Sequence, residues 1–138
     1  MRYLGVDYGT KRIGLAVGED SPFFVGPLRT IESEGSEGAA KAVAAAAEEE
    51  SAGVIVVGMP YALPGGEEGE TAKLVREMIG VLKKLTASEV MIEDERMTTA
   101  YAERLRRESG ASSKKFDKDA AAAAAILETY IEKVRKDN

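Results

Sequence analysis

One apolar run limits the fold of this chain more than any other feature. Residues 53–60, GVIVVGMP, carry no charged or polar side chain at any position. A strand with one exposed face alternates apolar and polar residues, whereas a continuous apolar run is typical of a strand covered on both faces, as in a parallel arrangement. A sheet with helices packed on both sides is therefore expected, which is an α/β fold.

Three strands are predicted before this run. The segments YLGVDYG (3–9), RIGLAVG (12–18) and FFVGPLRTI (23–31) are rich in branched and aromatic residues and are separated by Gly-Thr-Lys and Glu-Asp-Ser-Pro turns. Their short connections predict an antiparallel meander. Residues 36–51 are alanine-rich and predict a helix, with Gly53 placed to end it.

Helices and strands alternate in the rest of the chain. The predicted elements are a loop at 61–70, an amphipathic helix at 71–85, a strand at 89–94, a helix from Thr98 to Arg107, a polar loop at 108–116 and a last helix from about Asp117 to Val134. This order predicts one domain, residues 1–138, in which a mixed five-stranded sheet joins the three-strand antiparallel meander to parallel strands, with helices on both faces.

Composition excludes several kinds of chemistry. The 138 residues include no cysteine, which excludes disulfides and thiolate catalysis, and no histidine, which excludes Ser-His catalysis and the common zinc sites. An enzyme built from this chain must rely on carboxylates, lysines or tyrosines. The apolar stretch at the start of the sequence is too short for a signal peptide, and no uncharged run reaches about 18 apolar residues. We therefore expect a soluble cytoplasmic protein.

The charge is distributed unevenly. The formal net charge is −5, which by itself argues against a nucleic-acid partner. Residues 96–118, however, hold seven bases and three acids, a local net charge of +4, so the remainder carries −9. One segment could therefore meet a phosphate backbone despite the acidic total.

Three acids are candidates for one site, because ligands gather at the carboxyl ends of parallel strands. Asp7 ends the first strand, Glu95 follows the last strand, and Asp119 opens the final helix. Each acid also has a simpler explanation. Asp7 could be a turn residue, Glu95 a solvated strand end, and Asp119 a first-turn acid favoured by the helix dipole. On the first strand, Asp7 shares a face with Tyr3 and with Gly5, whose missing side chain leaves room.

Helical phase separates Asp119 from its neighbour Asp117. At 100° per residue, Asp119 falls within the apolar stripe of the last helix, whereas Asp117 falls outside it and is placed to cap the helix at the amide of residue 119 or 120. An inward carboxylate is costly unless it is paired or bound to a cation. For the second acid the choice stays open, because Glu95 has Asp94 as an alternative.

Three converging carboxylates without histidine suit hard cations that prefer oxygen, chiefly Mg²⁺ or Mn²⁺. Such a cluster can hold two ions about 4 Å apart, one activating water and one stabilising the leaving oxygen of a phosphodiester. The chemistry expected here is phosphoryl transfer, with the basic segment holding the substrate.

Four motifs resemble one family in their order along the chain. The motifs GVDYGTKRIGLAVG, VVGMP, EDERMTT and DKDAAAAAAIL together resemble the YqgF/RuvX family of ribonuclease H-like proteins, described as pre-16S rRNA nucleases and earlier as Holliday junction resolvases. The resemblance implies that Asp7, Glu95 and Asp119 are the acidic site residues. It also implies that Arg96 and Thr98 lie near the substrate and that the GMP loop faces it. This chain departs from the family at residues 61–65, YALPG, where a loop like LNMDG is common.

The leading hypothesis is a nuclease that uses Mg²⁺ or Mn²⁺ held by the three acids to cut structured RNA such as pre-16S rRNA, with branched DNA as the alternative substrate. Candidate phosphate contacts are Lys11, Arg12, Arg96, Arg104, Arg106, Arg107, Lys114 and Lys115. An actin-like ATPase or sugar kinase is a second hypothesis, disfavoured because such proteins pair two domains. A third is an RNA-binding assembly factor without catalysis. A monomer and a homodimer are both compatible with the sequence.

Overall fold

The computed structural model describes residues 1–61, 66, 68–95, 107 and 117–137. Within them a five-stranded sheet has the strand order β3-β2-β1-β4-β5. The strands are β1 (Arg2–Tyr8), β2 (Arg12–Asp20), β3 (Phe23–Glu32), β4 (Val54–Met59) and β5 (Glu89–Asp94). The first three pair antiparallel, whereas β4 is parallel to β1 and to β5, so the mixed sheet predicted from the sequence is confirmed.

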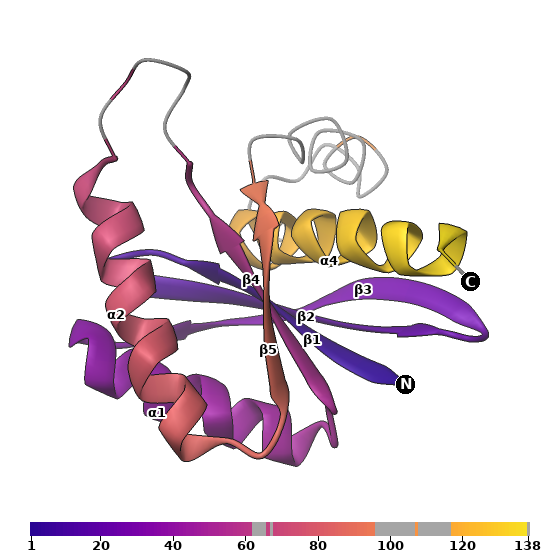
Figure 1. Ribbon diagram of the computed structural model, residues 1–138, viewed down its shortest axis with the longest axis horizontal. Helices are drawn as coiled ribbons and strands as arrows, with labels where there is room; N and C mark the ends of the chain where they lie inside the picture. The colour runs from indigo at the N-terminus through magenta and orange to yellow at the C-terminus, as the bar shows by residue number, and fades with distance from the viewer. Residues whose placement is uncertain (62–65, 67, 96–106, 108–116, 138) are drawn as a thin grey trace.

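Helices cover both faces of this sheet (Figure 1). The helices are α1 (Gly35–Glu49), α2 (Glu70–Leu85) and α4 (Lys118–Lys136). Helices α1 and α2 pack on one face and α4 crosses the other. The predicted helix from Thr98 to Arg107 and the loop at 108–116 lie outside the described residues, apart from Arg107, which is helical and exposed. No helix in the described part of the chain is long and apolar enough to cross a membrane.

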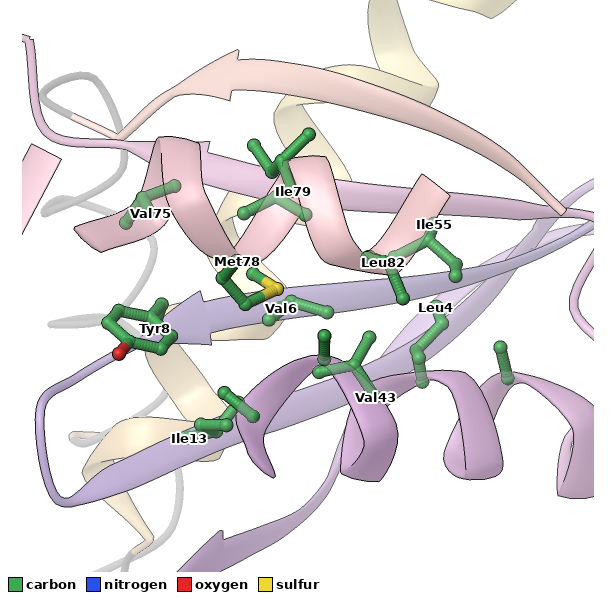
Figure 2. Close-up of a cluster of buried hydrophobic side chains, with 14 of the residues drawn as sticks. Leu4, Val6, Tyr8, Ile13, Val43, Ile55, Val75, Met78, Ile79 and Leu82 are labelled. Carbon is green, nitrogen blue, oxygen red and sulfur yellow. The ribbon is translucent and has the colours of Figure 1, made fainter. Parts of the chain in front are cut away.

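Alternation along β1 divides the core in two. Leu4, Val6 and Tyr8 point into the larger cluster beneath α1 and α2, whereas Tyr3 belongs to the smaller cluster beneath α4. Figure 2 shows the larger cluster, with Val6 of β1 beside Met78 of α2. Strand β4 is buried at all six positions, as its apolar run predicts, because both clusters draw on it. Each fully buried aliphatic side chain contributes roughly 1.5–3 kcal/mol to stability.

The end of α1 differs from the prediction. The helix stops at Glu49, and Ser51, with φ of 55°, takes the left-handed conformation that Gly53 was expected to provide near the helix end. The amide of Ala52 then donates to the carbonyl of Ala47 at 2.9 Å, which closes the last turn. Gly53 instead continues the sheet, because its amide donates to the carbonyl of Arg2 at 2.9 Å.

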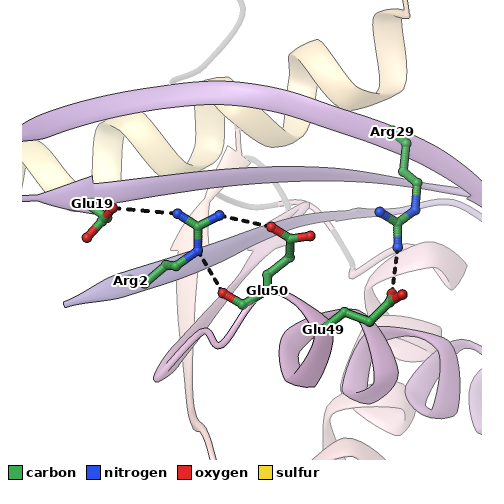
Figure 3. Close-up of polar contacts among 5 residues, drawn as sticks. All are labelled: Arg2, Glu19, Arg29, Glu49 and Glu50. Atoms are coloured by element: carbon green, nitrogen blue, oxygen red, sulfur yellow. Dashed lines mark hydrogen bonds and ion pairs between the residues drawn. The ribbon is translucent and has the colours of Figure 1, made fainter.

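Arg2 ties the end of α1 to the sheet (Figure 3). Its Nε atom donates to the Glu50 carbonyl at 2.7 Å, and its guanidinium lies 2.9 Å from the Glu50 carboxylate and 3.5 Å from that of Glu19. A second pair, Arg29 with Glu49, joins β3 to the same helix at 3.1 Å. The contacts of Arg2 lie at the amino end of β1, away from the strand end that carries Asp7.

Candidate active site

Asp7 lies near the carboxyl end of β1, in register with Gly14 of β2. It faces α4, as alternation from Tyr3 predicts. Burial raises the pKa of Asp7 to about 8, with further contributions from the charge of Glu95, a hydrogen bond with Glu95 and the charge of Asp119. In the metal-free protein the Asp7 carboxyl is therefore protonated at neutral pH.

Glu95 follows β5 directly and meets Asp7. Burial raises the pKa of Glu95, the charge of Asp94 acts in the same direction, and the hydrogen bond with Asp7 lowers it. The two carboxyls thus share a proton, which resides mainly on Asp7 and is donated to Glu95. Gly58 of β4 makes room for Ile126 of α4 and for Glu95, because a Cβ atom there would lie 2.4 Å from Cδ1 of Ile126 and 3.1 Å from Oε2 of Glu95. The carboxyl against Asp7 belongs to Glu95, while its alternative Asp94 acts on Glu95 through its charge.

Asp119 is placed by the first turn of α4. The cap is Asp117, whose carboxylate accepts from the amide of Ala120 at 3.0 Å and from the hydroxyl of Thr30 at 2.5 Å. Asp119 faces the sheet, where Nε of Arg12 lies 3.2 Å from its Oδ2. The distinction between capping and inward acids made from helical phase agrees with this geometry.

The three acids lie at one end of the sheet without converging on a single point. The charge of Asp119 acts on Asp7, and Glu95 contacts Asp7. In the part of the chain that the structure describes, no group of three acidic side chains is arranged to hold one metal ion. Asp119 is paired with Arg12, while Asp7 and Glu95 are paired with each other. The oxygen donors nevertheless suit a hard divalent cation.

Glycines allow α4 to approach the sheet closely. A Cβ atom at Gly14 would lie 1.9 Å from the carbonyl oxygen of Asp119, and one at Gly5 would lie 2.8 Å from the carbonyl oxygen of Ala123. The space at Gly5 was predicted from the sequence, whereas the close approaches at Gly14 and Gly58 were not. Glycine inside a strand often marks a place where another backbone approaches, and this signal could have identified Gly14. The atoms that surround Gly58 belong to side chains.

A partly buried ion pair near Glu95 was also missed. Glu93 is only 5% exposed, and its carboxylate accepts from the ammonium group of Lys133 on α4. Alternation along β5 predicts that Glu93 faces the same side as Glu95, but nothing in the sequence indicates its partner, which is 40 residues away. The pair joins β5 to the helix that carries Asp119.

A hollow of about 860 Å³ opens beside Asp119. Its lining comprises the β1–β2 turn, the end of β3 and the start of α4: Gly9, Thr10, Lys11, Arg12, Glu32, Ser33, Glu34 and Asp119. The turn is closed by the amide of Gly9 donating to the carbonyl of Arg12 at 2.9 Å. Two of the predicted phosphate contacts, Lys11 and Arg12, therefore lie at the site. Arg107 is exposed.

The other predicted substrate contacts fall outside the described residues. They are Arg96, Thr98, Arg104, Arg106, Lys114 and Lys115. The same holds for residues 62–65 of the loop after β4, where the sequence departs from the family pattern. Tyr61, the first residue of that departure, is 40% exposed.

The fold has counterparts among solved structures. The chain superposes on Thermus thermophilus RuvC in complex with Holliday junction substrate with a TM-score of 0.69 and 16% sequence identity, covering 99% of this chain and 96% of that chain. At this identity the similarity establishes the fold, which is the ribonuclease H-like α/β class predicted from the motifs.

Sequence comparison then gives the family. The family model RuvX, described as Holliday junction resolvase, matches residues 1–133, and the chain belongs to this family. Relatives named "Putative pre-16S rRNA nuclease" include a protein of Endomicrobium trichonymphae, 36% identical over 95% of this chain and 95% of its own length. A second, from Anaeromyxobacter sp. strain Fw109-5, is 37% identical over 96% of this chain and 97% of its own length.

Proposed function

We propose that residues 1–138 form one nuclease domain that hydrolyses phosphodiester bonds of structured RNA, with the 5′ end of pre-16S rRNA as the substrate. The observation that carries the proposal is the buried Asp7 carboxyl paired with Glu95 beside Asp119, at the carboxyl ends of β1 and β5. Membership of the RuvX family and the names of the curated relatives support the same activity.

The site residues have separate roles in this proposal. Asp7, Glu95 and Asp119 would hold Mg²⁺ or Mn²⁺, in a site for two ions. When bound, a divalent cation supplies an activated water and neutralises charge on the phosphate. Lys11 and Arg12 line the adjacent hollow and are placed to contact the phosphate backbone. The proton shared by Asp7 and Glu95 must leave before both carboxylates can ligate a cation.

A four-way DNA junction is the second candidate substrate, and the description of the family model favours it. The proposed domain is the same in both cases, because both reactions are hydrolysis of a phosphodiester in a structured nucleic acid. An experiment must therefore offer both substrates to the same preparation of protein.

The test measures cleavage of a pre-16S rRNA leader fragment and of a four-way junction in the presence of Mg²⁺ or Mn²⁺. Asp7→Asn should lower the cleavage rate by about 100-fold or more, because it removes a carboxylate that the proposed site needs to hold the divalent cation. The matched control is Asp117→Asn, which changes an exposed acid in the same way and keeps a capping oxygen.

The control variant should cleave at the wild-type rate. Undiminished cleavage by Asp7→Asn would contradict the assignment of the site. Cleavage of the junction with no cleavage of the RNA would replace the first substrate with the second. RNA binding without hydrolysis in either metal would instead support a role in assembly.

A further inference from the structure

The ion pair between Arg12 and Asp119 lies at the edge of the proposed active site. Arg12 is the first residue of β2, and its Nε atom lies 3.2 Å from Oδ2 of Asp119 in the first turn of α4. The Arg12 side chain is 56% exposed and that of Asp119 is 26% exposed. Both residues line the hollow beside the β1–β2 turn. A carboxylate that the proposed function needs as a ligand therefore already has a positively charged partner within the protein.

The backbone that carries Asp119 is held by close packing and by the helix cap, whereas its side chain is paired with an exposed arginine. The Asp119 carbonyl packs against Gly14, where even a methyl group would overlap it, and Asp117 fixes the helix start through Ala120 and Thr30. A rearrangement at this point must therefore take place in the Asp119 side chain. Rotation about its two side-chain torsions is the motion available to the carboxylate.

We propose that Arg12 is a positioning residue that holds the Asp119 carboxylate in the metal-free protein and yields it to the divalent cation. This inference rests on the proposed function, because it takes Asp119 as a ligand. It explains why the described residues contain no three acidic side chains arranged around one point, although three acids lie at the same end of the sheet.

The exchange would also link the cation to the substrate. Once released, the Arg12 guanidinium remains in the hollow beside Lys11, where it can contact a phosphate group of the nucleic acid. Arg12 would thus have two successive anionic partners with oxygen acceptors: the Asp119 carboxylate before the cation binds and a phosphate afterwards.

The affinity of the full chain for Mn²⁺, measured by titration calorimetry without nucleic acid, tests the exchange. Arg12→Gln should bind Mn²⁺ about two- to fivefold more tightly than Lys11→Gln, a factor that corresponds to the modest strength of an exposed ion pair. Lys11→Gln is the matched control, because it removes the same charge from the same hollow without removing the partner of Asp119. Arg12→Lys should bind Mn²⁺ with nearly the wild-type affinity.

A spectroscopic measurement separates the exchange from a general effect of charge. The Nε–H signal of Arg12 in a ¹⁵N correlation spectrum can be assigned by its absence in Arg12→Gln. Titration with diamagnetic Mg²⁺ should move this signal towards the position that it has in Asp119→Asn. Thermal unfolding of each variant verifies that it is folded, as expected for a side chain that is mostly exposed.

Equal Mn²⁺ affinities of Arg12→Gln and Lys11→Gln, with a stationary Nε–H signal, would overturn the exchange while leaving the proposed nuclease intact. Weaker Mn²⁺ binding by Arg12→Gln would also overturn it, since Arg12 would then be helping the cation to bind. If the wild-type chain bound no Mn²⁺ at millimolar concentration, both the exchange and the metal dependence of the proposed function would be wrong.

Discussion

Asp7, Glu95 and Asp119 come from distant parts of the sequence, and two contacts hold them: a hydrogen bond joins Asp7 to Glu95, and an ion pair joins Asp119 to Arg12. Asp7 is buried and protonated, Glu95 accepts its hydrogen bond, and the Asp119 carboxylate is paired with the Arg12 guanidinium. These contacts let three acids lie at one end of the sheet without three full charges. They also make the site sensitive to pH, because the shared proton is bound more tightly in the folded chain than in the unfolded one.

The stability of the metal-free protein should fall as pH rises, because of Asp7. Its pKa is raised from 3.8 to about 8 in the folded state, so the folded chain binds more protons than the unfolded chain between these values. The free energy of unfolding therefore decreases between about pH 4 and pH 8, by at most about 1.4 kcal/mol per pH unit from this group. Urea unfolding at several pH values in EDTA measures the effect.

Asp7→Asn is the comparison for this prediction, because it replaces the titrating carboxyl with a neutral group of similar shape. The variant should lose stability more slowly than the wild type as pH rises from 5 to 8. Parallel stability curves for the two proteins would mean that Asp7 does not carry the raised pKa.

At the scale of elements, α4 determines where the site is assembled. The helix contains a run of alanines, from Ala120 to Ala125, and packs against glycine positions of the sheet. The contact between Asp119 and Gly14 fixes its first turn beside Asp7, and the pair of Lys133 with Glu93 joins its last turns to β5. The helix thereby positions Asp119 beside Asp7, and it also holds β5, the strand that Glu95 follows.

Gly14→Ala should displace the first turn of α4. Its Cβ atom would lie 1.9 Å from the Asp119 carbonyl oxygen, and neither backbone can yield without moving the helix. Overpacking of this kind costs typically about 1–3 kcal/mol. We expect a loss of that size in the free energy of unfolding, together with weaker Mn²⁺ binding.

Gly26→Ala is the matched control for this change, because a Cβ atom on β3 there would meet nothing within 4 Å. The control should retain the stability and the Mn²⁺ affinity of the wild type. Equal losses in the two variants would show that glycine is needed for strand conformation in general and not for the approach of α4.

At the scale of the whole molecule, the two ends of the sheet differ in their charged groups: one holds ion pairs of opposite charge and the other holds several carboxyls. The amino end of β1 is held by Arg2 and its partners Glu19 and Glu50. The carboxyl end collects buried and partly buried carboxylates, which is an unfavourable arrangement unless they are protonated or bound to cations. The carboxylates at this end therefore lower the stability of the metal-free protein, and this is the end that carries the proposed function.

Mg²⁺ should stabilise the folded protein, and more strongly at pH 8 than at pH 6. The carboxylates must lose their shared proton to ligate a cation, so the affinity rises with pH. At a Mg²⁺ concentration about 100 times the dissociation constant, the gain is about 2.7 kcal/mol. Thermal unfolding with and without Mg²⁺ measures it, and EDTA should reverse it. Equal stabilisation of Asp7→Asn would indicate that the cation binds elsewhere.

The sequence alone determined the α/β class, the strand positions and the family, because these depend on periodicity and on motifs that are local in the chain. It also distinguished Asp119 from Asp117, since helical phase is a local property. The predicted end of α1 was less accurate, because Ser51 takes the left-handed conformation that was expected near Gly53.

Only the tertiary structure decided how the charged groups are paired. The partners of Asp119, Glu93 and Asp7 lie on other elements, and sequence spacing says nothing about which side chains meet across a sheet and a helix. Close packing at Gly14 likewise requires a helix that begins more than 100 residues later in the chain. The residue types indicate the chemistry of this site, but which acid pairs with another acid and which pairs with a base depends on distances that the fold alone establishes.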